Sequence, residues 1–255
     1  MSTTPFFSII TASYNSEKTI SNTIDSVLNL DFQDFEYIII DGNSSDSTLE
    51  IIQSFVPKFE AKGVSYRFIS EKDKGIYDAW NKGIQLSSGE WISFLGSDDS
   101  YISNALQLYF TEISKNNSIN YISSQVNLTN EKGEVLTVFG KKYEWINVIS
   151  DINIAQVGSF HKRELFEKVG LFSIEYKIVG DLDFYIRCKD TIQPGYFKKI
   201  TANMQNGGVS NNVYVALKEA LEVKLKYGYT PKWFTYYKFY SSLIKCYIKM
   251  ILNKK

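Results

Sequence analysis

The first hundred residues alternate between short apolar runs and segments with helical periodicity. Apolar runs at residues 6–11, 35–40, 64–69 and 91–95 predict four strands, and the segments between them repeat apolar residues every three or four positions. Strands that alternate with helices form βαβ units with a parallel sheet. The sequence therefore predicts an α/β fold, in which Pro57 is expected to end the second helix.

The alternation is less regular after residue 100. Helical periodicity predicts helices near residues 102–114, 162–169, 181–189 and 213–227. Strand-like runs occur at 121–128, 135–139 and 154–160, and Gly133 lies where a hairpin between the first two would turn. The second half is therefore expected to contain at least one hairpin.

Charge and cysteine content exclude several classes of protein. The 255 residues include 28 Lys or Arg and 28 Asp or Glu, so no overall positive field favours nucleic acid. Cys188 and Cys246 lie too far apart for a metal or redox motif. No apolar stretch reaches the roughly 18 residues of a membrane span, and the first residues do not resemble a signal peptide. These features predict a cytoplasmic protein that is soluble or lies at a membrane surface.

Asp98 and Asp99 stand side by side where the fourth apolar run ends. One of them could cap the helix expected near residue 102, because Asp is a favoured N-cap residue. The pair could instead bind a divalent cation, which prefers carboxylate oxygens. Asp41 and Asp46 follow the second predicted strand, so they would share one rim of the sheet with the pair. This shared rim favours a ligand site.

The segment from Asp41 to Thr48 is a short polar turn between a strand and a helix. Ser45 or Asp46 could cap that helix, and Gly42 could make the turn. The same turn could bind a nucleoside, because carboxylates accept hydrogen bonds from ribose hydroxyls and base N–H groups. No G-x-G-x-x-G follows the first strand, which argues against a dinucleotide fold.

Four blocks of the first hundred residues resemble the family 2 glycosyltransferases that have the GT-A fold. The blocks are TASYN (11–15), DGNSSDST (41–48), EKDKGIYDAWNKGI (71–84) and WISFLGSDD (91–99). Weaker similarity continues through GSFHKRELFEKVGLF (158–172), GDLDFYIR (180–187) and GGVS (207–210). The resemblance implies a GT-A, Rossmann-like fold with a mixed, mainly parallel sheet, and an enzyme that transfers a sugar from a nucleotide sugar.

The resemblance also implies a metal site and a nucleotide site. Ser97-Asp98-Asp99 is similar to a shortened DXD motif, in which Asp99 would bind Mn²⁺ or Mg²⁺ and Asp98 would reach the ribose or the metal shell. The implied nucleotide-binding residues are Thr11, Ala12, Tyr14, Asn15, Asp41, Ser44, Asp46, Asp73, Lys74, Gly75, Ser97 and Asp98. For Tyr14 the structural alternative is packing at the rim, and for Lys74 it is a solvated side chain.

The catalytic base implied by the resemblance is Asp181. Inverting transfer is a direct displacement, so the acceptor hydroxyl loses its proton as it attacks. From the residues alone, Asp181 could be an N-cap and Asp183 a first-turn acid favoured by the helix dipole. Arg187 follows Asp183 by four residues and is expected to form an ion pair with it.

The region expected to face the acceptor departs from the family pattern. Members that this chain resembles often have His-Gln before the F-x-x-R-E-L-F segment, whereas this chain has Ala155-Gln156. His161, the only histidine, is expected to be structural. Gln156 is a candidate for contact with the acceptor or diphosphate. Gly207 and Gly208 resemble part of the family's loop over the diphosphate, although they could also form a plain loop.

Residues 229–255 form a basic and aromatic tail with helical periodicity. At about 100° per residue, a row of lysines falls on one side of the helix and apolar residues fall on the other. The lysines are Lys238, Lys245 and Lys249, and the opposite residues are Tyr236, Tyr240, Ile244, Tyr247 and Ile251. This helix could dock on the domain with its lysines in water, or lie in a membrane interface that attracts lysine and aromatic side chains. We expect the membrane arrangement, because it fits a lipid-linked acceptor.

These expectations describe a metal-dependent inverting glycosyltransferase that takes a hexose or N-acetylhexosamine from a UDP-sugar. The implied acceptor is a glycan on undecaprenyl diphosphate in bacterial surface polysaccharide (O-antigen or capsule) synthesis, at the inner face of the cell membrane. Residues 1–228 would form the transferase domain, with a nucleotide-binding half at 1–100 and an acceptor-binding half at 101–228. Two alternatives remain. One is a nucleotidyltransferase, which would need several basic residues early in the chain to bind a triphosphate, whereas the first turn supplies only Lys18. The other is a catalytically silent module that binds sugar nucleotides or glycans.

Overall fold

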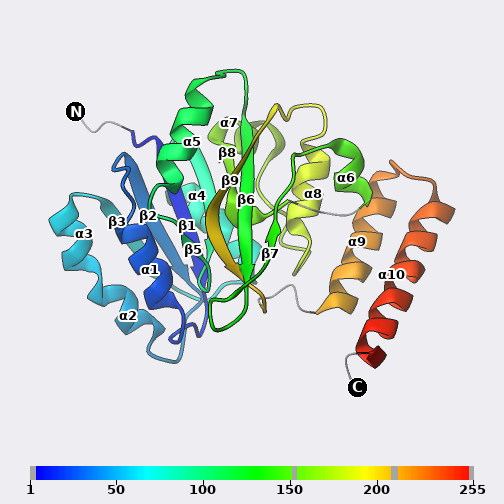
Figure 1. The fold of residues 1–255 in the computed structure, drawn as a ribbon, viewed down its shortest axis with the longest axis horizontal. Coiled ribbons are helices and arrows are strands. Elements are labelled where there is room, and N and C mark those ends of the chain that lie inside the picture. Colours follow the sequence, from blue (N-terminus) through cyan, green and yellow to red (C-terminus); the bar gives the residue numbers. More distant parts are fainter. Residues whose placement is uncertain (1–3, 151–153, 208–211, 253–255) are drawn as a thin grey trace.

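A computed structural model describes residues 4–150, 154–207 and 212–252. Within these ranges the chain forms nine strands in one sheet. The strands are β1 (Phe7–Ser13), β2 (Phe35–Asp41), β3 (Ser65–Ser70), β4 (Trp91–Gly96), β5 (Ser100–Tyr101), β6 (Tyr121–Thr129), β7 (Val135–Phe139), β8 (Ser159–Lys162) and β9 (Pro194–Gln205). Their order is β3-β2-β1-β4-β8-β6-β9-β5, with β7 paired to β6 (Figure 1). The expected α/β fold with a mixed sheet is confirmed.

Helices flank this sheet. They are α1 (Ile20–Leu28), α2 (Thr48–Ser54), α3 (Val56–Lys62), α4 (Ile76–Leu86), α5 (Ala105–Ser114), α6 (Trp145–Ser150), α7 (Arg163–Val169), α8 (Gly180–Arg187), α9 (Val213–Tyr227), α10 (Lys232–Leu252) and a 3₁₀ turn, η1 (Gln156–Gly158). The last two helices pack together at one end of the molecule (Figure 1). In the part of the chain that the structure covers, no helix combines the length and the hydropathy needed to cross a bilayer.

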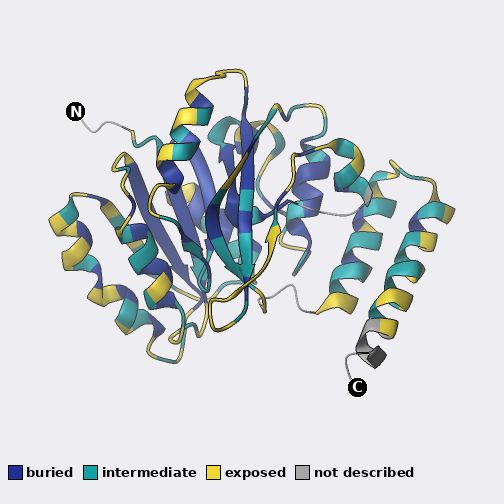
Figure 2. Cartoon of the chain, in the orientation of Figure 1, coloured by how far each residue is buried: buried dark blue, intermediate teal, exposed yellow. Residues whose placement is uncertain are grey.

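The first half follows the predicted alternation. β1 pairs in parallel with β2 and β4, and β2 pairs in parallel with β3. Ile9 packs in the cluster that includes α1 residues, whereas Ile10 packs in the cluster that includes α4 residues. Because β1 and β2 are covered on both faces, nearly all their residues are buried (Figure 2). Because β1, β2 and β4 run parallel, their carboxyl ends meet at one rim of the sheet.

Pro57 does not end the second helical segment. α2 ends at Ser54, and Phe55 both follows α2 and precedes α3. Pro57 lies in the first turn of α3, where a residue without an N–H is tolerated because that N–H has no partner within the helix. The prediction is wrong because proline disrupts the interior of a helix but suits its first turn.

The second half mixes antiparallel and parallel pairs. β6 and β7 form the predicted hairpin, with Gly133 in its turn at a φ of 79°. β8 is antiparallel to β4 and β6, whereas β9 is parallel to β6. The segment expected as a strand at 154–160 instead contains η1, and β8 begins only at Ser159.

The sequence pattern does not predict β9 or α6. β9 has 12 residues, but Lys198 and Lys199 interrupt its apolar positions, so no alternation of period two stands out. α6 has only six residues, which is too short for a helical period to be recognised. The helix expected from residue 102 begins later, at Ala105, because β5 occupies the preceding segment.

Candidate active site

Hydrogen bonds join the loops that follow β1, β2 and β4. The Asn15 N–H donates to Ser44 Oγ (2.9 Å), and Asn15 Oδ1 accepts from the Ser45 N–H (2.9 Å). Ser16 Oγ lies 2.9 Å from Ser97 Oγ, which links the β1 loop to the β4 loop. Asn15 has a φ of 47°, in the left-handed region that Asn tolerates better than most residues. The structure thus brings three of the four sequence blocks together at the rim.

Asp41 connects three strand ends and has no exposed surface. Its Oδ1 accepts from Ser13 Oγ (3.2 Å) and from Ser44 Oγ. Its Oδ2 accepts from the Ser44 N–H (3.0 Å) and from Ser70 Oγ (2.6 Å). These donors belong to β1, to the loop after β2 and to β3, so the carboxylate holds the rim together. A hydrogen bond between Asp41 and the nucleotide base stays a prediction. It would require one of these serine hydroxyls to give up its hydrogen bond to the carboxylate.

Asp46 holds the start of α2. Its Oδ1 accepts from the Thr48 N–H (3.0 Å) and from Thr48 Oγ1 (2.6 Å), and its Oδ2 accepts from the Glu17 N–H (3.2 Å). The first of these bonds satisfies a backbone donor that has no partner inside the helix. The N-cap of α2 is Ser47, so the alternative that Ser45 or Asp46 caps the helix is wrong, although Asp46 still stabilises the helix start from the position before the cap. Its contact with a nucleotide stays a prediction.

Tyr14 and Asp73 approach Gly42 from two different loops. A Cβ at residue 42 would lie 3.4 Å from the Tyr14 ring and 2.7 Å from Asp73 Oδ2. This close approach is possible because residue 42 has no side chain, and it brings the remaining sequence block (71–84) to the rim. The Tyr14 side chain is 65% exposed, so its ring is available to a ligand.

Thr11 and Ala12 lie beneath the rim. Thr11 is fully buried, and its Oγ1 accepts from the Tyr37 hydroxyl (3.0 Å). Ala12 is half-buried and packs against the apolar clusters under α4. The side chain of Thr11 is thus part of the core in this structure, and its contact with a nucleotide stays a prediction.

The loop before α4 contains Asp73, Lys74 and Gly75. The Gly75 N–H donates to Asp73 Oδ1 (2.8 Å), and the Lys74 N–H donates to Asp78 Oδ2 (3.0 Å). Gly75 has a φ of 121°, which side chains disfavour. The Lys74 side chain is exposed, as its solvated alternative predicts. The loop is therefore held by Asp73 and by Asp78 of α4, while its lysine is exposed to solvent.

Asp98 and Asp99 converge at the end of β4. A Cβ at Gly96 would lie 2.6 Å from Asp99 Oδ2 and 2.9 Å from Asp98 Oδ1, so both carboxylates fold back over the same glycine. Asp99 Oδ1 accepts from the Gln205 N–H (2.9 Å) at the end of β9. Burial, and next the charge of Asp98, raise the pKa of Asp99 to about 7, and burial also raises the pKa of Asp98. The two charges are thus close together and poorly solvated.

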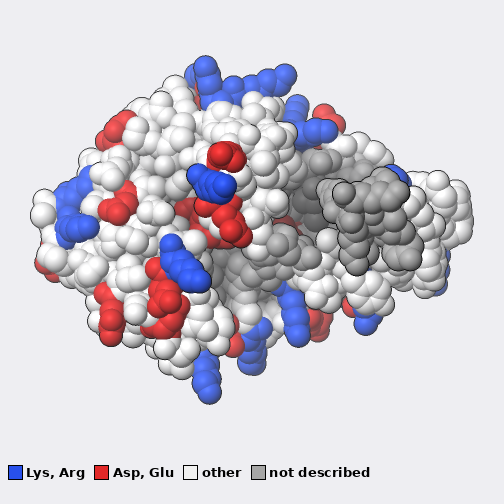
Figure 3. Space-filling view, turned by 60° about the horizontal axis from the view of Figure 1, so that its bottom comes forward, with Lys and Arg blue, Asp and Glu red and all other residues white. Residues whose placement is uncertain are grey.

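This arrangement fits a divalent cation and excludes the helix-cap alternative. The residue before α5 is Asn104, so neither Asp98 nor Asp99 is its N-cap. A cation would offset the repulsion between the two carboxylates and would accept their hard oxygens as ligands. Among the residues described here, no group of three or more Asp, Glu, His or Cys side chains is placed to hold a metal, so further ligands would have to come from outside the chain. Acidic side chains also gather near the middle of the face that comes forward in Figure 3.

Asp181 lies in the first turn of α8, and the N-cap of this helix is Val179. The N-cap alternative for Asp181 is therefore wrong. Asp181 Oδ1 accepts from the Leu182 N–H (2.8 Å) and lies 3.3 Å from the Tyr77 hydroxyl. Burial raises the pKa of Asp181 to about 6. A carboxylate with this pKa is ionised at neutral pH and is still basic enough to take a proton during a reaction.

Tyr77 is a site residue that the sequence reasoning did not single out. Its hydroxyl donates to the Ile178 carbonyl oxygen (2.6 Å) and also faces Asp181. A Cβ at residue 180 would lie 2.8 Å from the Tyr77 ring, so Gly180 allows α8 to begin directly against that ring. The available signal is its place in the third block, just after the loop 73–75. Tyr77 thus connects the nucleotide half of the sheet to the helix that carries Asp181.

His161 is a core residue, as expected. It is fully buried, and burial lowers its pKa to about 3. Its Nε2 lies 3.1 Å from the Tyr185 hydroxyl, which donates to Gln156 Oε1 (2.8 Å). Gln156 Nε2 is buried and finds no hydrogen-bond partner within the described ranges. The histidine therefore supports a tyrosine that orients the Gln156 amide, while the contact of Gln156 with a substrate stays a prediction.

The glycine loop after β9 can be followed only in part. The Asn206 N–H donates to the Thr129 carbonyl oxygen (2.8 Å), which fixes the start of the loop against β6. Gly207 is exposed at a φ of 139°, and Gly208 lies outside the described residues.

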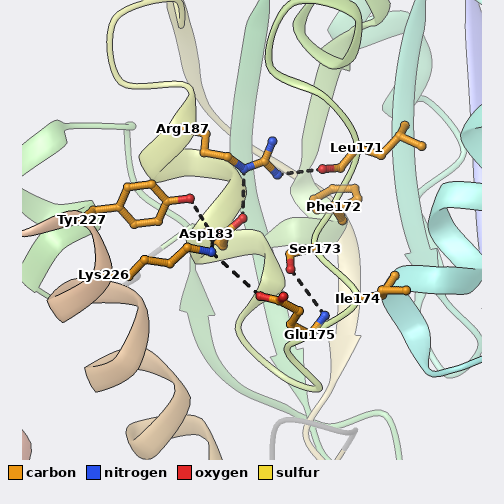
Figure 4. Close-up of a pocket in the computed structure, with 9 residues that line it drawn as sticks. All are labelled: Leu171, Phe172, Ser173, Ile174, Glu175, Asp183, Arg187, Lys226 and Tyr227. Carbon is orange, nitrogen blue, oxygen red and sulfur yellow. Dashed lines mark hydrogen bonds and ion pairs between the residues drawn. The ribbon is translucent and has the colours of Figure 1, made fainter.

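Asp183 belongs to a separate cluster between α8 and α9 (Figure 4). Arg187 Nε donates to Asp183 Oδ2 (2.9 Å), which confirms the expected ion pair, and the Tyr227 hydroxyl donates to Asp183 Oδ1 (2.9 Å). The pocket around them contains none of the predicted catalytic or nucleotide-binding residues. This cluster ties α9 to the helix that carries Asp181.

Comparison with known proteins identifies the family. The family described as Glycosyl transferase family 2 matches residues 8–149, which is more than half of the chain. A curated relative, the PGL/p-HBAD biosynthesis glycosyltransferase of Mycobacterium tuberculosis, is 29% identical over 213 residues, which cover 82% of this chain and 80% of the relative. The glucosyltransferase WfgD of Escherichia coli is 37% identical over 110 residues, which cover 43% of this chain and 42% of WfgD.

Solved structures share the fold at low sequence identity. TarS 1–349 of S. aureus, in complex with UDP-GlcNAc, has a TM-score of 0.68 at 20% identity over 85% of this chain and 64% of that one. A longer TarS chain is covered over only 41% of its length. The mannosyltransferase PcManGT of Pyrobaculum calidifontis has a TM-score of 0.66 at 14% identity over 91% of this chain and 66% of its own. Together with the family match, the sheet and its rim show that the chain belongs to glycosyl transferase family 2.

Proposed function

We propose that this glycosyltransferase moves a hexose or N-acetylhexosamine from a UDP-sugar to a glycan acceptor, with inversion at the anomeric carbon. The observation that carries the proposal is Asp181, a half-buried carboxylate held beside Tyr77, whose pKa is raised to about 6. The name of WfgD includes UDP-Glc, and one TarS structure contains UDP-GlcNAc, which supports a UDP donor. PcManGT was solved with GDP-Man, so the fold alone does not select the base.

Asp181 is the proposed base. As the acceptor oxygen forms its bond to the anomeric carbon, the bond from that carbon to the diphosphate oxygen breaks. The hydroxyl proton passes to Asp181, whose Oδ2 is available because the bonds described above involve Oδ1. A single displacement of this kind inverts the anomeric centre. Tyr77 would keep the carboxylate in place during the transfer.

Asp99 and Asp98 are the proposed ligands of Mn²⁺ or Mg²⁺. Their carboxylates already converge over Gly96, and the diphosphate would supply further oxygens. A cation held there would neutralise negative charge on the departing diphosphate. The nucleotide would lie against the joined loops of the rim, with its base near the exposed ring of Tyr14.

The proposed acceptor is a glycan linked to undecaprenyl diphosphate, in the synthesis of a bacterial surface polysaccharide. The support is the relative WfgD, whose name gives alpha-D-GlcNAc-diphosphoundecaprenol as its acceptor. Residues 1–100 would form the nucleotide half and 101–228 the acceptor half. The family match, over residues 8–149, covers most of the first half and extends into the second, and it weakens the nucleotidyltransferase alternative.

Isothermal titration calorimetry tests the donor site. UDP, GDP, dTDP and NAD would each be titrated with and without Mn²⁺, with Asp99→Ala as the variant. We expect one nucleoside diphosphate to bind in a metal-dependent way, and this binding to disappear in the variant. Absence of binding for all four compounds would refute the donor site.

A second variant separates binding from catalysis. Asp181→Asn should bind nucleotide and metal as the wild type does, while transfer to acceptor is lost. Full transfer activity in this variant would remove Asp181 as the base. Binding of the donor by the wild-type chain without any turnover would instead support the catalytically silent module.

A further inference from the structure

Helix α10 presents an apolar face to solvent. Trp233, Tyr237, Tyr240, Ile244 and Ile248 are between 50% and 72% exposed. Their spacing of three or four residues places them along one side of the helix. Single exposed apolar residues need no explanation, but five in a row along one helix face indicate an interaction surface.

The opposite side of α10 is the side that docks. Thr235 is buried, and Ser242 and Cys246 are half-buried, at positions that fall on one face of the helix. α10 packs against α9, as Figure 1 also shows. This side of the helix also carries the half-buried ring of Phe239, so the docked side combines small, polar and aromatic residues. α10 is docked on α9 with Lys232 and Lys245 exposed, as the docked alternative predicts, but Tyr240 and Ile244 also lie in solvent.

Positive charge accompanies this apolar face. From Val223 to the end, the sequence has eight lysines and no acidic residue, although the whole chain has 28 residues of each sign. Lys232 and Lys245 are exposed, and the helical repeat places them about 100–120° to either side of the apolar row. Long lysine side chains in this position can reach polar headgroups while the apolar row is buried. The side chains of Tyr247, Lys249 and Ile251 lie outside the described part of the chain.

We propose that the apolar face of α10 binds the surface of an anionic membrane. A row of aromatic and aliphatic side chains flanked by lysines is typical of a helix that lies in the interface of a bilayer. A nucleic acid would use the lysines and leave the row from Trp233 to Ile248 in water. A second copy of the chain would cover the row, but it would bring two lysine-rich segments together. The surface lies outside the proposed donor and base residues, so it can be tested apart from transfer.

Vesicle flotation of the full chain tests the proposal. We expect the protein to float with vesicles of phosphatidylcholine and phosphatidylglycerol, more weakly with phosphatidylcholine alone, and less as salt is added. Trp233→Ser with Tyr237→Ser and Ile244→Ser should lower binding to the mixed vesicles by at least about tenfold. Lys232→Gln with Lys245→Gln should lower it about fivefold per lysine, on the anionic vesicles only.

A matched control uses exposed apolar residues elsewhere. Leu136 and Val138 of β7 are also about half exposed, so Leu136→Ser with Val138→Ser should leave flotation unchanged. All substituted side chains are on the surface, and thermal unfolding would show that each variant folds. Flotation of the triple variant at the wild-type level would overturn the proposal.

Other occupants of the face give different results. Binding to an RNA oligonucleotide without any flotation would overturn the membrane proposal in favour of nucleic acid. A dimer in sedimentation velocity that the triple variant dissociates, again without flotation, would overturn it in favour of a second copy. Loss of flotation in both variant sets, with the β7 control unaffected, would support the membrane surface.

Discussion

Replacing Asp181 with Asn should raise the stability of the folded protein at neutral pH while it removes transfer. Asn keeps the shape of the side chain and the Oδ1 acceptor for the Leu182 N–H, but it carries no charge. Burial raises the pKa of Asp181 from 3.8 to about 6, so the folded protein binds this proton more tightly than the unfolded chain does. The protonated carboxyl therefore contributes stability at low pH, which is lost as the pH rises from about 4 to about 6.

The size of the effect follows from the same values. A pKa that rises from 3.8 to about 6 corresponds to about 3 kcal/mol, at about 1.36 kcal/mol per unit. Asp181 is partly open to solvent, so we take about half of this value, roughly 1.5 kcal/mol. For a chain of this length, Asp181→Asn should then raise the Tm by about 3–6 °C near pH 8. Near pH 4 the wild-type carboxyl is largely protonated when folded, so the two proteins should unfold at similar temperatures.

Thermal unfolding followed by circular dichroism from about pH 4 to about pH 8 measures this effect. Asp190→Asn is the matched control, because it removes a charge from an exposed acid shortly after α8 and should leave the Tm almost unchanged. A lower or equal Tm for Asp181→Asn near pH 8 would refute the reasoning, since it would show that the charged carboxylate is not disfavoured by its site.

Three further predictions follow from the contacts of the rim and the sheet. Tyr77→Phe removes the hydroxyl whose hydrogen bond lowers the pKa of Asp181. The acid limb of the pH–rate profile, expected near pH 6 in the wild type, should therefore move to higher pH by up to about one unit. An unmoved limb would contradict the contact. Asp41→Asn leaves one acceptor oxygen in place of two, so the free energy of unfolding, measured with a chemical denaturant, should fall by about 1–3 kcal/mol. An unchanged unfolding midpoint would argue against the role of Asp41 in joining the strand ends. Gly83→Ala places a Cβ against Ile10 in the core under α4 and should lower the free energy of unfolding by about 1–3 kcal/mol. Ser54→Ala, at an exposed position of α2, should change it little.

The sequence predicts those parts of the fold in which local pattern and tertiary environment agree. β1 and β2 are continuous apolar runs because both faces are covered, and the apolar spacing of α4 matches its buried side. β9 is not predicted, because Lys198 and Lys199 interrupt it and its pairing with β6 decides its conformation. Strand propensity is strongly context-dependent in this way.

The residues of the candidate site also differ in how far the sequence predicts them. The position of Asp41, Asp98 and Asp99 along one rim could be predicted, since carboxyl ends of parallel strands share an edge. The role of Asp181 came only from family resemblance, because a first-turn acid is also favoured by the helix dipole. Tyr77 could not be chosen from the residues alone, since its contact with Asp181 depends on how α4 and α8 pack.

The hydrogen bonds within the rim also determine how its backbone behaves before any ligand arrives. The N–H groups of Ser44, Ser45 and Gly75 all donate to side chains within these loops, so their conformations are set in advance. A nucleotide would therefore meet a surface that loses little conformational entropy on binding. Exchange of these amide hydrogens with solvent should already be slow in the empty protein, because each must break its own bond before it can exchange. These three amides therefore belong to loops whose conformation is already set in the absence of a ligand.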